Sequence, residues 1–326
     1  MLQERNQRMR QFAITGVAGY IAPRHLRAIR DTGNQLVAAL DPHDSVGILD
    51  QFGHEIAFFT EFERFDRHLE KMRRAPGNQG IDYLSICSPN YLHDAHIRLA
   101  LRLGANAICE KPLVITPWQI DTLQELEAEY PGTIHSILQL RVHPNILALR
   151  EKILATDPAH RFQVSLTYIT SRGAWYGYSW KGDPAKSGGI ATNIGIHFFD
   201  MLLWMFGGVQ SQDVYLKGPQ KMSGFLELER ADVTWYLSLD KQDLTQAQQQ
   251  QQPATFRSMQ VDGIEVDFTG GFTDLHTRMY ETILQDGGYG LSVVRPSIEL
   301  AYRIRTSECR PLTEMAHPML QQQPLG

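Results

Sequence analysis

Residues 12–23 read FAITGVAGYIAP, a short apolar run that ends in a glycine-rich turn and leads into a helical stretch. The turn has the spacing Gly16-x-x-Gly19-x-x-Ala22, one residue looser than the usual G-x-G-x-x-G/A pattern. Glycines after a first strand let the backbone approach a pyrophosphate, and the next helix N-terminus supplies N–H groups and a favourable dipole. The stretch therefore predicts the first βα unit of a dinucleotide-binding sheet, with a tight turn that binds nothing as the alternative.

Asp41 strengthens the dinucleotide interpretation, because it ends the second apolar run at residues 36–40. An acid at this point can accept hydrogen bonds from both hydroxyls of an adenosine ribose. Its carboxylate would repel a 2′-phosphate and no arginine follows it, which favours NAD over NADP. An Asp-Pro turn is the alternative reading of Asp41 alone.

Two further strand-like runs, at residues 83–87 and 107–109, end in Ser88-Pro89-Asn90 and in Glu110-Lys111-Pro112. Strands alternate with helical stretches throughout this half, which predicts βαβ units and a parallel sheet. Such sheets bind ligands outside the carboxyl ends of their strands. A lysine held there is partly desolvated and can exchange protons, so Lys111 is a catalytic candidate; a surface turn lysine is the alternative.

After about residue 136 the pattern changes to strands with few helices between them. Several runs alternate apolar and polar residues, which is typical of a sheet with one face exposed to solvent. We therefore expect an α/β protein with a Rossmann dinucleotide-binding domain at residues 11–136. Residues 137–326 should form an α+β domain with a large, mostly antiparallel open sheet, for substrate binding and oligomerisation. The predicted strands of this domain are residues 162–170, 213–217, 224–229, 233–239 and 256–266.

Composition excludes several classes of protein. The 326 residues are 43% hydrophobic and carry a formal net charge of −5, which argues against non-specific nucleic-acid binding. No apolar stretch approaches a membrane span, and the polar N-terminus lacks the apolar core of a signal peptide. Three cysteines make no disulfide framework, and no metal site is predicted. We expect a cytoplasmic protein that binds neither nucleic acid nor membrane.

A second cluster lies at residues 188–200, GGIATNIGIHFFD. Asn193 and His197 are four residues apart and share a helical face if the helix begins by Asn193. A single histidine on an apolar helix is more often a satisfied core residue than a catalyst, so this cluster alone decides nothing.

Residues 16–22, 88–90, 110–112 and the glycine-led stretch ending in His197 together resemble the Gfo/Idh/MocA family of nicotinamide-dependent oxidoreductases. The resemblance covers nearly the whole chain and implies that Lys111 lies beside the nicotinamide, with His197 facing the reacting hydroxyl from the second domain. Many members have aspartate where this chain has Asn193, which weakens any argument that a carboxylate makes His197 more basic. The implied NAD contacts are Gly16, Gly19, Tyr20, Ile21, Asp41, Ser88, Pro89, Asn90, His93, Glu110 and Lys111.

Among family activities, the resemblance implies NAD-dependent oxidation at C3 of UDP-N-acetyl-glucosaminuronic acid, for synthesis of a diacetamido-uronic sugar of surface polysaccharide. Lys111, His197 and Asn193 are the implied catalytic residues. We favour His197 as the base because histidine needs little pKa tuning, although the roles of Lys111 and His197 could be exchanged. A free sugar or inositol dehydrogenase is one alternative, and a non-catalytic NAD-sensing protein is another.

Basic and aromatic side chains concentrate at residues 172–187. Arginine and lysine suit a diphosphate or hexuronate carboxylate, and an aromatic face can stack on uracil; a loop packed on the sheet edge or another subunit is the alternative. The resemblance also implies a homo-oligomer, most simply a homotetramer, formed through the second sheet. The candidate substrate contacts are Arg172, Tyr176, Lys181, Lys186, Asn193 and Arg141.

Overall fold

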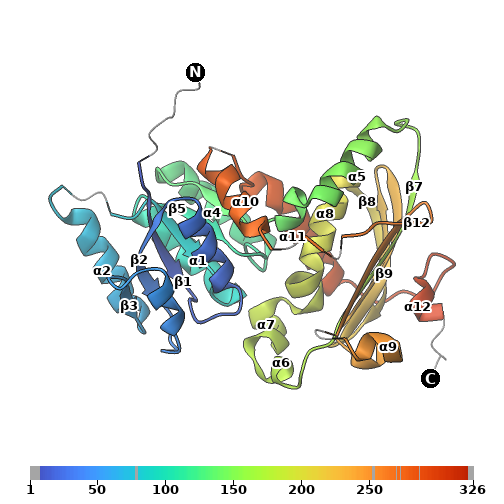
Figure 1. The fold of residues 1–326 in the computed structure, drawn as a ribbon. Coiled ribbons are helices and arrows are strands. Elements are labelled where there is room, and N and C mark those ends of the chain that lie inside the picture. The colour runs from blue at the N-terminus through green and yellow to red at the C-terminus, as the bar shows by residue number, and fades with distance from the viewer. Residues whose placement is uncertain are drawn as a thin grey trace. The chain divides into compact units, whose positions relative to one another are not determined.

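The computed structural model describes residues 8–77, 80–251, 254–268, 270–271, 273–285 and 287–321. The chain forms two compact units (Figure 1). The first consists of residues 1–113, 118–137 and 274–293, and the second of 114–117, 138–273 and 294–326. Residues 274–293 were expected in the second domain but belong to the first unit, because helix α10 (Leu275–Leu284) packs against helix α1 (Ala22–Asp31).

The first unit is built on a parallel sheet with the strand order β3-β2-β1-β4-β5-β6 among its described residues. The order reverses between β1 and β4, and this switch point is where open α/β sheets bind ligands. The Rossmann-type sheet expected from the sequence is therefore confirmed. Its strands are β1 (Gln11–Thr15), β2 (Gln35–Leu40), β3 (Ala57–Phe59), β4 (Tyr83–Ile86), β5 (Asn106–Cys109) and β6 (Ile134–Ser136). The other helices along this part of the chain are η1 (Gly47–Gln51), α2 (Phe62–Arg74), η2 (Asn90–Leu92), α3 (His93–Arg102) and α4 (Pro117–Glu129).

The second unit contains a mixed sheet with the order β12-β11-β7-β10-β9-β8 within the described part of the chain. Only the β7–β10 pair among these is parallel, so the expected mostly antiparallel sheet is confirmed. The run expected at residues 256–266 is two strands, because Asp262 and Gly263 have φ angles of 50° and 78° and make a turn. The strands are β7 (Phe162–Thr170), β8 (Val209–Lys217), β9 (Lys221–Leu228), β10 (Ala231–Ser238), β11 (Thr255–Val261) and β12 (Ile264–Glu265). The helices after residue 138 other than α10 are η3 (Gln139–Val142), α5 (Pro144–Ala155), α6 (Trp175–Tyr178), η4 (Trp180–Gly182), α7 (Pro184–Ser187), η5 (Ala191–Gly195), α8 (Ile196–Phe206), η6 (Lys241–Asp243), α9 (Gln246–Gln249), α11 (Leu291–Thr306) and α12 (Pro318–Gln321).

The two faces of this sheet have different cover. On one face Trp235 of β10 meets Phe199 of α8 edge to face, with ring centroids 5.4 Å apart. On the other face Tyr236 stacks on His317, which lies just before α12. Ala316 and Leu320 complete an apolar cluster there. The C-terminal segment therefore shields part of the second face of the sheet.

One helical run of the described residues, Pro184–Phe206, is long and apolar enough to cross a membrane by length and composition. The expectation that no stretch approaches a membrane span was therefore wrong. However, 72% of the most apolar window is buried inside the structure, as in the core helix of a globular domain.

Candidate active site

The glycine turn after β1 closes tightly over the neighbouring strand ends. Gly16 has a φ angle of 77°, and its N–H donates to the carbonyl of Leu40 at the end of β2 over 2.8 Å. A Cβ atom on Gly16 would lie 2.5 Å from the carbonyl carbon of Cys87, and one on Gly19 would lie 3.0 Å from the carbonyl oxygen of Gly16. Only glycine fits at position 16. The backbone here therefore carries no side chain, which the close approach of a dinucleotide requires.

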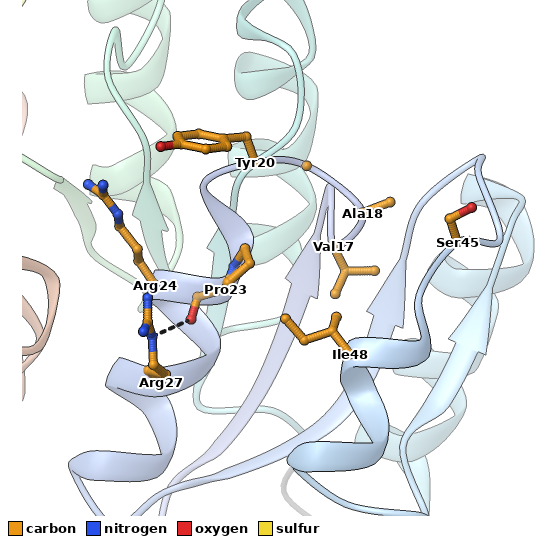
Figure 2. Close-up of a pocket in the computed structure, with 9 residues that line it drawn as sticks. Val17, Ala18, Tyr20, Pro23, Arg24, Arg27, Ser45 and Ile48 are labelled. Carbon is orange, nitrogen blue, oxygen red and sulfur yellow. Dashed lines mark hydrogen bonds between the residues drawn. The ribbon is translucent and has the colours of Figure 1, made fainter. Parts of the chain in front are cut away.

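A hollow of about 490 Å³ adjoins this turn. Figure 2 shows its lining, which comes from the turn, from helix α1, and from the loop after β2 and helix η1 that follows it. No side chain caps the N-terminus of α1, whose dipole, with Arg24 and Arg27, favours an anionic ligand such as a diphosphate. The two arginines were missed at the sequence level, although their position in the first turns of the helix after the glycines is a usable signal. The lining residues are Val17, Ala18, Gly19, Tyr20, Pro23, Arg24, Arg27, Ser45 and Ile48.

Asp41 lies at the end of β2 with only 6% of its surface exposed. Its Oδ2 accepts the N–H of Ala18 over 3.0 Å, and its Oδ1 accepts the N–H of His43 over 2.9 Å. The carboxylate is thereby fixed against the glycine turn, with oxygen lone pairs left for a ribose. Its predicted contact with the cofactor agrees with this position and stays a prediction.

The turn after β4 is tied to the turn after β5 by His93. The two ring nitrogens of His93 lie 2.8 Å from the carbonyl oxygens of Ser88 and Pro112. Burial lowers the pKa of His93, although both carbonyl contacts oppose the shift. Ser88 Oγ in turn lies 2.9 Å from Nδ1 of His96. His93 is 1% exposed and both its ring nitrogens have backbone partners, and its predicted contact with the cofactor stays a prediction.

Glu110 and Lys111 follow β5. Lys111 is partly buried and is joined to Pro112 by a cis peptide bond. Glu110 is 6% exposed, and its Oε1 lies 2.9 Å from Nε2 of both His25 and His276. Burial raises the pKa of Glu110, but hydrogen bonds from the two histidines outweigh it and hold the pKa well below the usual range. Glu110 was expected to contact the cofactor, and here it has internal partners.

His25, Glu110 and His276 are also the group of described residues whose donor atoms lie close enough together to hold a metal ion, all within 4.8 Å. The two 2.9 Å spacings are those of direct N–H···O hydrogen bonds. Two ligands of a tetrahedral zinc ion, at about 2.0–2.1 Å each, stand about 3.3 Å or more apart. The observed geometry therefore favours a hydrogen-bonded carboxylate.

In the second unit, Asn193 lies in the π-helical segment η5 and His197 in the first turn of α8. The helix has begun by Asn193, as the predicted shared face requires, and it is widened there into a π-helical turn; such segments are frequent at functional sites. Asn193 is 7% exposed and donates through Nδ2 to the hydroxyl of Tyr176 over 2.8 Å. Burial raises the pKa of Tyr176. His197 is partly buried.

The basic residues expected to hold the substrate differ in their surroundings. Arg172 and Lys186 are exposed, and Lys186 is 4.0 Å from Asp183. Lys181 is partly buried over the ring of Trp180, and burial lowers its pKa. Arg172 and Lys181 influence each other and so belong to one positive region.

Arg141 has an internal partner. It is 7% exposed and binds both carboxylate oxygens of Asp200, at 2.7 and 2.8 Å. Its guanidinium also lies over the ring of Trp204. This bidentate pair joins η3 to α8, so the structure gives Arg141 a role within the second unit, and its predicted contact with substrate stays a prediction.

Comparisons with known proteins agree with this arrangement. Residues 10–137 match the model for an oxidoreductase family with an NAD-binding Rossmann fold, GFO_IDH_MocA, and residues 159–250 match the C-terminal alpha/beta domain of the same family. Two crystal structures of the WlbA (WbpB) dehydrogenase from Thermus thermophilus are 50% identical in sequence, with TM-scores of 0.91 and 0.90. Both matches cover 95% of this chain and 99% of the other. One was solved with NAD and alpha-ketoglutarate, the other with NAD and UDP-GlcNAcA.

Among curated relatives, the inositol 2-dehydrogenase of Rhizobium meliloti is 26% identical over 208 residues, 60% of this chain and 55% of the relative. The matched segments span 35% to 55% of the length of the first curated relatives. With both domain models matched and half of the residues shared with the Thermus enzyme, the chain belongs to the Gfo/Idh/MocA family of oxidoreductases, whose N-terminal domain is an NAD-binding Rossmann fold.

Proposed function

We propose that this chain is an NAD-dependent dehydrogenase that oxidises the C3 hydroxyl of UDP-N-acetyl-glucosaminuronic acid to the 3-keto sugar. The main support is the 50% identity, over 95% of the chain, to a dehydrogenase solved with NAD and UDP-GlcNAcA. The chain's own residues agree with it. It has a bare glycine turn at the switch point, a lysine at the end of a parallel strand and a histidine on an apolar helix.

The reaction removes a hydride from C3 and a proton from its hydroxyl. NAD, when bound, accepts the hydride at C4 of its nicotinamide. We assign His197 as the base, because an imidazole titrates near neutral pH. Lys111 donates a hydrogen bond to the same oxygen and stabilises the negative charge that develops as the proton leaves. Asn193, held by Tyr176, orients the sugar by hydrogen bonding.

The positive region around Arg172 and Lys181 is proposed to hold the diphosphate or the hexuronate carboxylate. Guanidinium and ammonium groups bind such oxygens through charge-assisted hydrogen bonds. Tyr178 and Trp175 are exposed in the same segment and offer an aromatic face to uracil.

A 2-oxo acid is proposed as the second substrate, since the Thermus enzyme was solved with alpha-ketoglutarate. Such an acid takes up one hydride and one proton and becomes a 2-hydroxy acid, which returns the cofactor to its oxidised form. The 3-keto sugar would then serve a cytoplasmic route to a diacetamido-uronic sugar of lipopolysaccharide or O-antigen, with a homotetramer as the working form.

The proposal is tested by incubating the purified protein with UDP-N-acetyl-glucosaminuronate, with and without 2-oxoglutarate. We expect absorbance at the NADH band without the oxo acid, and a 3-keto product by mass spectrometry together with 2-hydroxyglutarate when it is present. Silence in both reactions would defeat the proposal. Turnover of free sugars or inositol with indifference to UDP compounds would instead identify the other enzyme activity, and NAD binding with no reduction of any of these substrates would identify a sensing protein.

A further inference from the structure

We propose that His25 and His276 are positioning residues that hold Glu110 as an ionised carboxylate and thereby fix the backbone that presents Lys111. The inference rests on the proposed function, in which Lys111 acts on the reacting hydroxyl. It concerns a buried hydrogen-bonded cluster that includes no residue of the glycine-turn hollow.

The contacts assign every proton of the cluster. An ionised carboxylate only accepts hydrogen bonds, so both histidines donate their Nε2–H groups to Oε1 of Glu110. The Nδ1 atom of His25 then carries no proton, and it accepts a hydrogen bond from the hydroxyl of Tyr280 over 2.7 Å. Tyr280 in turn lies 2.7 Å from Ser85 Oγ, which donates to it. Each hydrogen bond in the series from Ser85 through Tyr280 and His25 therefore donates in the direction of Glu110.

His276 supports the same assignment. Its Nδ1 atom is buried and has no hydrogen-bond partner among the described residues. In the neutral ring this leaves one unpartnered acceptor, whereas in the protonated ring it would leave an N–H of a charged group without an acceptor, which is far more costly. The tautomer of His276 with its proton on Nε2 therefore accounts for both of its ring nitrogens.

The carboxylate of Glu110 lies next to Lys111. The second oxygen of Glu110 accepts the backbone N–H of Lys111 over 3.2 Å. Burying an ionised carboxylate is unfavourable unless its oxygens are bonded, and here donors from α1, α10 and the Lys111 backbone bond it. Each of these bonds constrains the short turn between β5 and Pro112. A displacement of about 1 Å at a catalytic group can reduce a rate by about a hundredfold.

The arrangement also explains why α10 belongs to the first unit. His276 and Tyr280 are one helical turn apart and occupy the same buried face of α10. The rings of His25 and His276 meet edge to face, with centroids 5.0 Å apart. A segment far along the chain thus returns to support the turn that bears Lys111.

The experiment compares His276→Leu with His276→Gln, because the glutamine amide can still donate to Glu110 and leucine cannot. We expect kcat to fall about ten- to a hundredfold in His276→Leu, with KM for the UDP-sugar and Kd for NAD within about threefold of the parent protein. His276→Gln should recover most of the lost kcat. His135→Leu removes another histidine ring of the first unit, one whose Nε2 lies 2.9 Å from Thr133 Oγ1 and has no bond to Glu110. It serves as the matched control and should keep the parent kcat.

Hydrogen exchange of a peptide spanning residues 106–115 gives a readout independent of turnover. It should be faster in His276→Leu and restored in His276→Gln. If His276→Leu does not fold, Tyr280→Phe removes only the hydroxyl that donates to His25 and should reduce kcat about three- to tenfold, again with unchanged NAD binding.

The outcomes separate the two proposals. A parent protein without turnover of the UDP-sugar defeats the proposed function, while hydrogen exchange still tests the cluster. An active parent with unchanged kcat and exchange in both His276→Leu and Tyr280→Phe overturns the inference. Stoichiometric zinc or another transition metal in the purified protein would also overturn it, because the three side chains would then be metal ligands.

Discussion

At the residue scale, Lys111 and His197 have different chemical tasks. A general base and a charge-stabilising group each contribute about 10²–10⁴-fold to a rate. We therefore expect Lys111→Met and His197→Asn each to reduce kcat by at least a hundredfold. NAD binding should stay within about threefold, because neither side chain lies in the glycine turn or in the hollow beside it.

Steady-state kinetics and quenching of protein fluorescence by NAD measure the two quantities. Arg67→Met on α2, which changes another basic side chain of the first unit, is the control and should behave as the parent does. Near-normal turnover in both Lys111→Met and His197→Asn would contradict the assignment of either residue to the reaction.

His317 allows a prediction about pH. Burial lowers its pKa from 6.5 to about 4, and its Nε2 lies 3.0 Å from Thr167 Oγ1. Between pH 4 and 6.5 the unfolded chain binds this proton and the folded chain does not, so stability falls as the pH falls through this range. At pH 5 the loss from this one group is about 2 kcal/mol.

The measurement is urea unfolding at pH 7.5 and pH 5, followed by tryptophan fluorescence. Four of the five tryptophans, Trp175, Trp180, Trp204 and Trp235, lie in the second unit with His317, so the signal comes mainly from that unit. His317→Gln removes the titrating ring and should reduce the difference between the two pH values by about 2 kcal/mol. If the difference in the free energy of unfolding between the two pH values is the same in His317→Gln, a group other than His317 takes up the proton.

At the scale of elements, the local sequence pattern was enough to predict the strands and the residues at their ends. Gly16, Asp41 and Lys111 each follow an apolar run, and a parallel sheet aligns the ends of such runs, so their places at one sheet edge follow from the sequence. The partners of Glu110 do not follow from it. His25 lies on the first helix and His276 on α10, and only the packing of α1 against α10 brings them together.

The widening of the helix at Asn193 was equally beyond sequence reasoning. A spacing of four residues suggests one helical face, and nothing in ATNIG distinguishes a π-helical segment from an α-helical one. Arg141 shows the same limit. Its ion-pair partner Asp200 comes from α8, and only the tertiary fold could reveal this pairing.

The glycine turn can be tested as an element. Gly16→Ala would place a methyl group 2.5 Å from the backbone of Cys87, at a φ angle of 77°. We expect a loss of stability on the order of 3 kcal/mol and a loss of NAD binding, because the strand ends must separate. Gly33→Ala is the matched control. Gly33 has a φ angle of 75°, but a Cβ there meets nothing within 4 Å, so the change should cost only about 1–2 kcal/mol and leave NAD binding intact.

Thermal unfolding and NAD titration of both variants measure these effects. Equal losses in Gly16→Ala and Gly33→Ala would mean that backbone conformation alone accounts for the cost. The close approach of Cys87 would then be of no consequence for binding.

At the scale of the whole molecule, composition and strand pattern were enough to predict two domains, but not the path of the chain between them. Residues 274–293 follow the strands of the second half in sequence, and no local signal shows that they return to the first unit. His276 and Tyr280 in this segment bond to residues far away in the sequence, and hydrophobic periodicity carries no information about such contacts.

The second sheet bears on the assembly of the molecule. One face is covered by α8, and the other is covered in part by the C-terminal segment over Ile169, Phe225 and Tyr236. Beyond that cluster, Arg161 and Asp232 form an ion pair near Thr234, which is only partly buried in a single chain. We predict that this face packs against a second copy, as part of a homotetramer.

Light scattering after gel filtration at micromolar concentration should then give four times the 37.1 kDa mass of one chain. Thr234→Arg places a long charged side chain on the face and should shift the protein to a smaller species, because a charge buried without a partner is strongly unfavourable. Glu129→Arg, on an exposed position at the end of α4, adds positive charge away from the sheet and should leave the mass unchanged. A single-chain mass for the parent protein would refute the tetramer. An unaltered tetramer in Thr234→Arg would instead show that copies associate through another surface.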